Sequence, residues 1–195
     1  YLTTAGIGEV IDAFDLSMDR CQPGDFIMVN GTLGDHGMAV MSAREGFNIQ
    51  TQLHSDTGPV HTCVAALEKF GTSVRWMRDP TRGGAAAVLN ELVETGEIGV
   101  LLKEENLPFS NGARSIAEML GFDLLNSACE GRLIAVCAPE VANEALEAWR
   151  QLPEGTGAKI IGQITDKPAK VVLETFTGGR RLVDVPYGEL LPRIC

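Results

Sequence analysis

Hydrophobic positions along the chain form short continuous runs separated by longer stretches with helical spacing. The run Phe26-Ile-Met-Val29 is typical of a buried strand, and residues 74–77, 98–102 and 132–137 have the same character. Three more strands are predicted over residues 159–164, 171–174 and 181–185, with a hairpin turn at residues 177–180. Residues 1–11 have the pattern of a half-buried strand.

Helices are predicted between these strands. Residues 38–45, the segment from Pro59, residues 84–94 and residues 111–120 repeat apolar side chains at helical spacing, with Gly96 and Gly121 as stops. A further helix places Val141 and Trp149 on one side and glutamates on the other. The alternation predicts an α+β domain with a mixed β-sheet covered by helices.

The predicted elements divide the chain into three parts. Residues 1–14 look like the remnant of a missing N-terminal domain, of which residues 1–11 would be the last strand. Residues 15–185 form the α+β domain. Pro186 and Pro192 disfavour regular structure, so residues 186–195 are expected to be a mobile tail ending in Cys195.

The composition of the chain argues against several classes of function. The formal net charge of −10 disfavours attraction to nucleic acid or to anionic membranes. There is no apolar run long enough to cross a bilayer and no signal peptide, which predicts a cytoplasmic protein. The five cysteines include no CxxC pair, so neither a disulfide framework nor a metal site is predicted.

Two glycine-containing loops could bind an anion. The first, Gly31-Thr-Leu-Gly-Asp-His-Gly37, follows a strand and precedes a helix, so that the backbone amides of Gly31, Gly34 and Gly37 could approach phosphate. It matches neither common phosphate-loop motif, and a tight structural turn is equally compatible with it. His36 in such a loop is more often a packing residue than a base.

The second loop is Asp79-Pro-Thr-Arg-Gly-Gly84. Here Asp79 could orient a donor, Arg82 could pair with phosphate, and Gly83 and Gly84 leave room for a ligand. A helix cap and turn is the alternative. Two such loops in one domain favour an anionic ligand.

Two residues could act on a substrate. Glu130, in the stretch Asn126-Ser-Ala-Cys-Glu-Gly-Arg132, could accept a proton, although a solvated loop glutamate is more common. The Cys195 thiol, at the end of the tail, could be a nucleophile that reaches a distant site, and the alternative is an accidental free thiol.

These two loops, the stretch around Glu130 and the terminal Pro192-Arg-Ile-Cys195 together resemble HypE, a hydrogenase maturation family within the superfamily of aminoimidazole ribonucleotide synthetase and selenophosphate synthetase. The resemblance covers essentially the whole chain as the C-terminal part of such a protein. It implies the C-terminal domain fold of that superfamily. It also implies ATP-dependent dehydration of an S-carbamoyl group on Cys195 to thiocyanate, which supplies cyanide ligands for nickel-iron hydrogenase.

The same resemblance implies roles and partners. Cys195 would carry the carbamoyl group and Glu130 would assist proton removal. The nucleotide cleft would be lined by Gly31, Gly34, Asp35, His36, Gly37, Asp79, Thr81, Arg82, Gly83 and Gly84. The carbamoyltransferase HypF and a HypC–HypD iron scaffold would be partners, and the full-length protein would be a homodimer.

One departure matters: the family's N-terminal domain, which supplies magnesium ligands and a catalytic lysine, is absent from this chain. We therefore expect the chain to fold but not to catalyse alone. Two other functions remain open at this point: a small-molecule synthetase of the same superfamily, which needs no terminal thiol, and a non-catalytic module that docks maturation partners.

Overall fold

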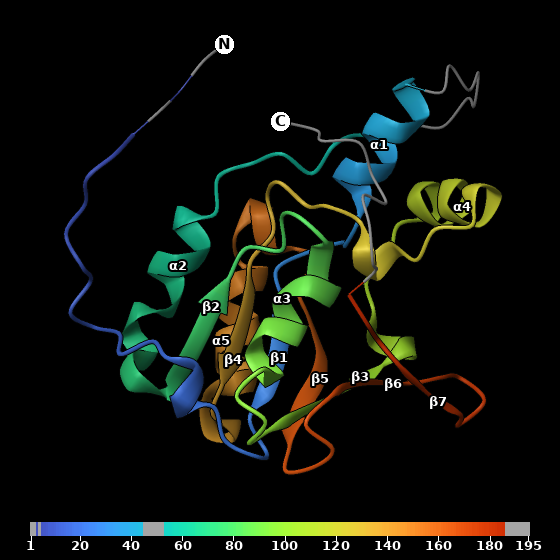
Figure 1. The fold of residues 1–195 in the computed structure, drawn as a ribbon. Coiled ribbons are helices and arrows are strands. Elements are labelled where there is room, and N and C mark those ends of the chain that lie inside the picture. The colour runs from blue at the N-terminus through green and yellow to red at the C-terminus, as the bar shows by residue number, and fades with distance from the viewer. Residues whose placement is uncertain (1–2, 4, 45–52, 186–195) are drawn as a thin grey trace.

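The computed structural model describes residue 3, residues 5–44 and residues 53–185 of the chain (Figure 1). A sheet of seven strands runs through the molecule, with helices on both of its faces. The elements are η1 (Met18–Arg20), β1 (Phe26–Val29), α1 (Asp35–Arg44), α2 (His61–Leu67), η2 (Glu68–Ser73), β2 (Val74–Arg78), α3 (Gly84–Val93), β3 (Gly99–Lys103), η3 (Glu104–Asn106), α4 (Asn111–Leu120), η4 (Leu124–Asn126), β4 (Ile134–Cys137), α5 (Pro139–Arg150), η5 (Pro153–Gly155), β5 (Lys159–Thr165), β6 (Val171–Glu174) and β7 (Arg180–Leu182).

The strand order is β2-β4-β1-β5-β3-β6-β7. β1 lies near the centre and pairs antiparallel with β4 and β5, whereas β3 and β6 pair in parallel. The predicted hairpin is present between β6 and β7. The sheet is therefore mixed, and the predicted α+β class is confirmed.

The two faces of the sheet bury different helices. Ile27 and Val29 of β1 belong to the core cluster that includes α3, whereas Met28 between them belongs to the cluster that includes α2 and α5. This alternation follows from the period of two along a strand. On the α2–α5 side, the fully buried Trp149 donates its indole N–H to the carbonyl of Cys63 at 2.8 Å, which ties the two helices together.

A third layer lies beyond the end of β1. Helices α1 and α4 pack on each other through Met38, Met41, Ala113 and Ile116, at the top of the molecule in the view of Figure 1. α4 has the predicted bounds. Ser110 caps its start by accepting the N–H of Ala113 at 3.1 Å, and Gly121 ends it.

Several boundaries differ from the predictions. α1 begins at Asp35, inside the predicted glycine loop, and the helix expected from Pro59 begins at His61. β4 begins at Ile134 instead of Arg132, because the N–H of Leu133 donates to the side chain of Asn30 instead of to the backbone of a neighbouring strand. Within the described residues, no helix has the length and apolar character needed to span a membrane.

The predicted strand over residues 1–11 is wrong for the part that the structure describes. Residue 3 and residues 5–11 belong to no strand, and Ile7 and Val10 are 105% and 88% exposed. A strand needs backbone partners along its length, and no described strand pairs with this segment. The assignment of residues 1–14 to a missing domain remains a prediction.

Candidate functional site

The candidate site lies around the end of β1, where a buried side-chain amide bonds to neighbouring segments of the chain. Asn30 is fully buried, and its side-chain N–H groups donate to the carbonyls of Gly131 and Glu154, both at 3.3 Å. Its side-chain oxygen accepts the N–H of Leu133 at 2.9 Å. This residue joins the end of β1 to the start of β4, and it was not among the predicted site residues.

The glycine loop after β1 packs tightly against residues 124–129. The N–H of Gly34 donates to the sulfur of Cys129 at 3.2 Å, and the N–H of Gly37 donates to the carbonyl of Ala128 at 3.0 Å. The hydroxyl of Ser127 donates in return to the carbonyl of Gly34 at 3.1 Å. Two of the amides expected to face an anion therefore bond within the protein.

Close approach of other groups explains why these positions are glycines. A Cβ atom at Gly31 would lie 2.9 Å from the guanidinium carbon of Arg132, and one at Gly34 would lie 3.1 Å from atoms of Leu124 and Ser127. The glycines thus let protein groups come near the loop.

The second glycine loop meets the same segment from the other side. The N–H of Cys129 donates to the carbonyl of Pro80 at 3.1 Å. Gly84 has a φ of +60°, and a Cβ atom there would lie 2.5 Å from the carbonyl oxygens of both Leu125 and Ser127. Residues 124–129 are therefore held between the two predicted loops.

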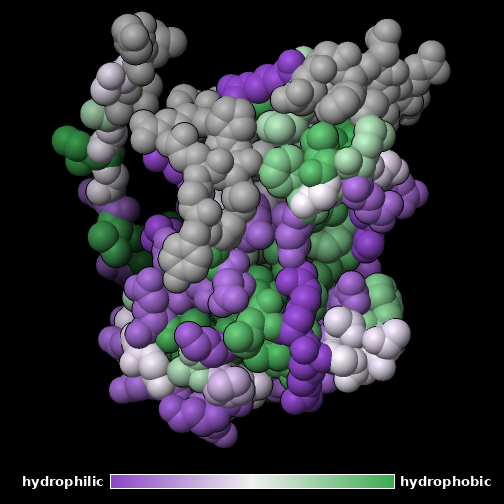
Figure 2. All heavy atoms as spheres, turned by 45° about the vertical axis from the view of Figure 1, so that its right-hand side comes forward, coloured by the Kyte–Doolittle hydropathy of each residue, from purple (hydrophilic) through white to green (hydrophobic). Residues whose placement is uncertain are grey.

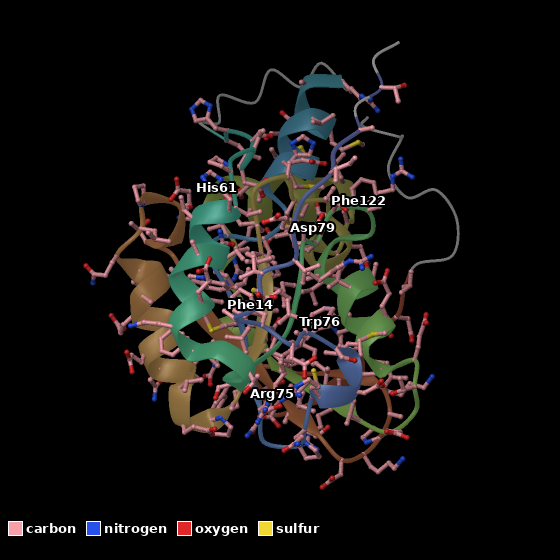
Figure 3. All side chains as sticks on the ribbon, turned by 90° about the vertical axis from the view of Figure 1, so that its left-hand side faces the viewer. Phe14, His61, Arg75, Trp76, Asp79 and Phe122 are labelled. Carbon is pink, nitrogen blue, oxygen red and sulfur yellow. The ribbon has the colours of Figure 1, made fainter. Side chains whose placement is uncertain are left out.

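The polar side chains of this second loop are more open. Asp79 and Arg82 are exposed and Thr81 is half-buried. Neither Asp79 nor Arg82 has an ion pair or hydrogen bond with the described part of the chain. Asp79 follows β2 at the end of the strand that lies toward α1 (Figure 3).

Glu130 lies where these loops meet, and its backbone is fixed. Its N–H donates to the Oδ1 atom of Asp56 at 2.7 Å, and Glu130 as a whole is half-buried. Two residues along, Arg132 donates from Nε to the carbonyl of Thr32 at 2.7 Å. The stretch around Glu130 is thereby attached to the first glycine loop.

Asp35 and His36 connect the first loop to its other neighbours. Asp35 is buried, and its carboxylate accepts the hydroxyl of Ser110 at 2.6 Å and the hydroxyl of Thr32. His36 Nδ1 lies 2.8 Å from the hydroxyl of Ser55, while its buried Nε2 has no hydrogen-bond partner in the described structure. Asp35 thus has a structural task beside its predicted role.

The structure brings together Gly31, Gly34, Asp35, His36 and Gly37, the loop from Asp79 through Thr81, Arg82, Gly83 and Gly84, and Glu130. Cys195 lies outside the described residues, as does the rest of the predicted tail. Sequence reasoning missed Asn30, Asp56 and Ser127. A polar residue directly after a buried strand was the available signal for Asn30, whereas no spacing pointed to Asp56.

Burial makes the four cysteines of the described domain poor nucleophiles. It raises the pKa of Cys21 and Cys137 to about 12 and raises the pKa of Cys63 and Cys129 as well. At pH 8, a thiol with a pKa of 12 is a thiolate in only about one molecule in ten thousand, against about a quarter for a free thiol.

We therefore expect iodoacetamide at pH 8 to modify at most one of the five cysteines of the folded protein, and all five after denaturation. Peptide mass spectrometry of the two samples checks this. Rapid labelling of Cys129 in the folded protein would contradict the buried arrangement.

A separate pocket of about 220 Å³ lies between α4, η3 and β6. Its lining mixes apolar side chains such as Phe109 and Phe122 with Arg114, Glu118 and Arg181, and it includes none of the predicted site residues. Figure 2 brings this side of the molecule forward and shows apolar atoms exposed among polar ones. Within the described residues, no cluster of three or more His, Cys, Asp or Glu could hold a metal ion.

Curated relatives match this chain over its whole length. The family model for the C-terminal domain of AIR synthase related proteins matches residues 22–174. The chain is 44% identical, over all of its length and 57% of the relative's, to carbamoyl dehydratase HypE from Bradyrhizobium diazoefficiens. It therefore spans little more than half of the curated relatives that it matches.

Solved HypE structures have the same fold at more than 30% identity. Hydrogenase maturation protein HypE in complex with ATP has a TM-score of 0.85 at 35% identity, covering 92% of this chain and 55% of that one. The HypE–HypF complex has a TM-score of 0.84 at 38% identity, covering 88% and 56%. The resemblance to HypE is confirmed, and the chain belongs to the family of AIR synthase related proteins, as a C-terminal domain.

Proposed function

We propose that this chain is the C-terminal part of an ATP-dependent carbamoyl dehydratase. The enzyme converts an S-carbamoyl group on Cys195 into a thiocyanate and so supplies cyanide ligands for the iron of nickel-iron hydrogenase. Similarity along the entire chain to a relative named carbamoyl dehydratase supports this. The observation that carries the proposal is the position of Glu130, on a loop clamped between the two glycine loops.

Dehydration of the carbamoyl group requires a proton acceptor and an activated carbamoyl oxygen. ATP supplies a phosphoryl group that turns the carbamoyl oxygen into a good leaving group. The Glu130 carboxylate accepts one proton from the carbamoyl nitrogen. The C–O bond then breaks, the phosphate leaves with the second N–H proton, and the C≡N bond forms. The S–C bond stays intact, so that the product is S–C≡N on Cys195.

Within this chain, the loop from Asp79 to Gly84 fits a phosphate group better than the loop from Gly31 to Gly37. Arg82 is exposed and unpaired in the described structure, and it stands beside the N-terminus of α3, where the helix dipole favours an anion. The N–H groups of Gly34 and Gly37 already have partners. The first loop then shapes the wall of the nucleotide cleft.

Other parts of the proposal concern groups outside the described residues. Magnesium would be held mainly by an N-terminal domain, as the resemblance to the family implies. The carbamoyltransferase HypF is the proposed carbamoyl donor, as a solved HypE–HypF complex suggests, and a HypC–HypD scaffold would accept the cyanide. A homodimeric, cytoplasmic full-length protein is proposed, and this chain alone would be inactive.

The test is ADP formation by the full-length protein supplied with the carbamoyltransferase, carbamoyl phosphate and ATP. We expect ADP to form with Cys195 present and to be lost completely with Cys195→Ala, because the thiol carries the substrate. A small-molecule synthetase of the same fold would keep its activity after this substitution. A docking module would form no ADP with either protein.

A further inference from the structure

A buried carboxylate outside the predicted motifs holds the backbone of Glu130. The side chain of Asp56 is 0% exposed, and its Oδ1 atom accepts the N–H of Glu130 at 2.7 Å. A carboxylate that accepts a backbone N–H makes a charge-assisted bond, which is stronger than a neutral one. The position of the Glu130 backbone therefore depends directly on a residue 74 positions earlier in the chain.

The backbone around Asp56 presses on the same loop. A Cβ atom at Gly131 would lie 2.7 Å from the nitrogen of Gly58 and closer still to the carbonyl oxygen of Asp56. The Ser55 hydroxyl, one residue earlier, lies 2.8 Å from Nδ1 of His36, at the start of α1. Residues 55–58 thus form a strap that is attached to α1 at one end and covers residues 130–131 at the other.

Arg132 extends the link from the strap to the first glycine loop. Its Nε atom lies 3.9 Å from Oδ2 of Asp56 and donates to the carbonyl of Thr32 at 2.7 Å. The Thr32 hydroxyl in turn donates to Asp35. Asp56 therefore fixes Glu130 relative to the loop that forms the wall of the proposed cleft.

The second oxygen of Asp56, Oδ2, faces Nε of Arg132 at 3.9 Å but makes no hydrogen bond in the described structure. Oδ2 is buried, and leaving a buried acceptor unpaired costs folding free energy. An asparagine would supply the bond to Glu130 without burying a charge. The Glu130 backbone therefore needs an acceptor at this position, and it does not need the charge of a carboxylate.

From these contacts we infer that Asp56 is a positioning residue, which sets the place of the Glu130 carboxylate for proton transfer from the carbamoyl nitrogen. The inference rests on the proposed function. Misplacement of a catalytic group by about 1 Å can slow a reaction on the order of a hundredfold. Loss of Asp56 is expected to act on the rate only through Glu130.

A double-mutant cycle in the full-length protein tests this. The single-turnover rate of dehydration of carbamoylated Cys195 is measured for wild type, Asp56→Ala, Glu130→Gln and the double variant. We expect Asp56→Ala to slow wild type by about 10- to 100-fold, with an unchanged KM for ATP, and to have no further effect when Glu130 is already Gln. Asp56→Asn, which keeps an acceptor for the N–H, should recover most of the rate.

Asp25 provides a matched control at the other end of β1. Its side chain is 3% exposed, accepts the N–H of Gln22 at 2.8 Å and lies 3.7 Å from Nε of Arg75. Asp25→Ala should lower the melting temperature about as much as Asp56→Ala while leaving the dehydration rate near wild type. If Asp56→Ala does not fold, the cycle is run with Asp56→Asn, for which a smaller slowing with the same dependence on Glu130 is expected.

These measurements distinguish failure of the proposed function from failure of the positioning role of Asp56. A wild-type protein that never dehydrates the carbamoyl group would overturn the proposed function and this inference with it. If wild type is active but the effects of Asp56 and Glu130 multiply independently, or if Glu130→Gln is as fast as wild type, the function stands and the positioning role of Asp56 is wrong.

Discussion

Glu130→Gln in the full-length protein is expected to slow dehydration of carbamoylated Cys195 by about 10²- to 10⁴-fold, the usual contribution of a positioned general base. Glutamine preserves the size of the side chain and the N–H bond to Asp56, so the loop itself should stay in place. In the proposed reaction, carbamoyl transfer to Cys195 precedes this step, so the transfer should be unaffected. The variant is therefore expected to accumulate the carbamoylated form, which peptide mass spectrometry detects directly.

Glu94→Gln is the control for the loss of a glutamate charge. Glu94 is exposed just beyond the end of α3, so its replacement should leave the rate unchanged. A Glu130→Gln protein that forms thiocyanate as quickly as wild type would remove Glu130 from the mechanism and require another proton acceptor.

Gly84→Ala is expected to destabilise this chain by about 3 kcal/mol or more, because two costs combine at one position. Gly84 has a φ of +60°, which costs an alanine roughly 1 kcal/mol. The added Cβ would also lie 2.5 Å from two backbone carbonyl oxygens, those of Leu125 and Ser127, and these can move only if the segment carrying them moves. The midpoint of urea denaturation measures the loss.

Gly96→Ala isolates the first cost. Gly96 has a φ of +76°, but an added Cβ atom would meet nothing within 4 Å, so we expect a loss of about 1 kcal/mol from the backbone conformation alone. Equal losses for the two variants would show that residues 124–129 do not press on the second glycine loop as described.

Local patterns in the sequence predicted most of the regular elements. The periodicity of residues 84–94 and 111–120, together with Ser110 and the stops at Gly96 and Gly121, placed α3 and α4 within a residue of their observed bounds. These signals are local, since a cap or a glycine acts on the turn beside it. The strand predicted for residues 1–11 is wrong for residues 5–11, because a strand also needs a partner, which a pattern of alternation cannot supply.

The sequence predicted which loops contribute to the site but not how these loops contact one another. The motifs identified Glu130 and both glycine loops, yet the use of Gly34 and Gly84 for close packing by residues 124–129 depends on contacts distant in sequence. Asp56 is the clearest example, because its bond to Glu130 joins two loops through the fold alone. No spacing rule relates an isolated aspartate to a glutamate 74 residues later.

In the proposed reaction, the thiol of Cys195 carries the carbamoyl group, which is dehydrated beside Glu130. The most direct measurement is the mass of the C-terminal peptide of the full-length protein after incubation with carbamoyltransferase, carbamoyl phosphate and ATP. We expect the peptide first to gain one carbamoyl group and then to lose one water. A peptide that keeps the carbamoyl group unchanged in the presence of ATP, or never acquires it, would contradict the proposed reaction.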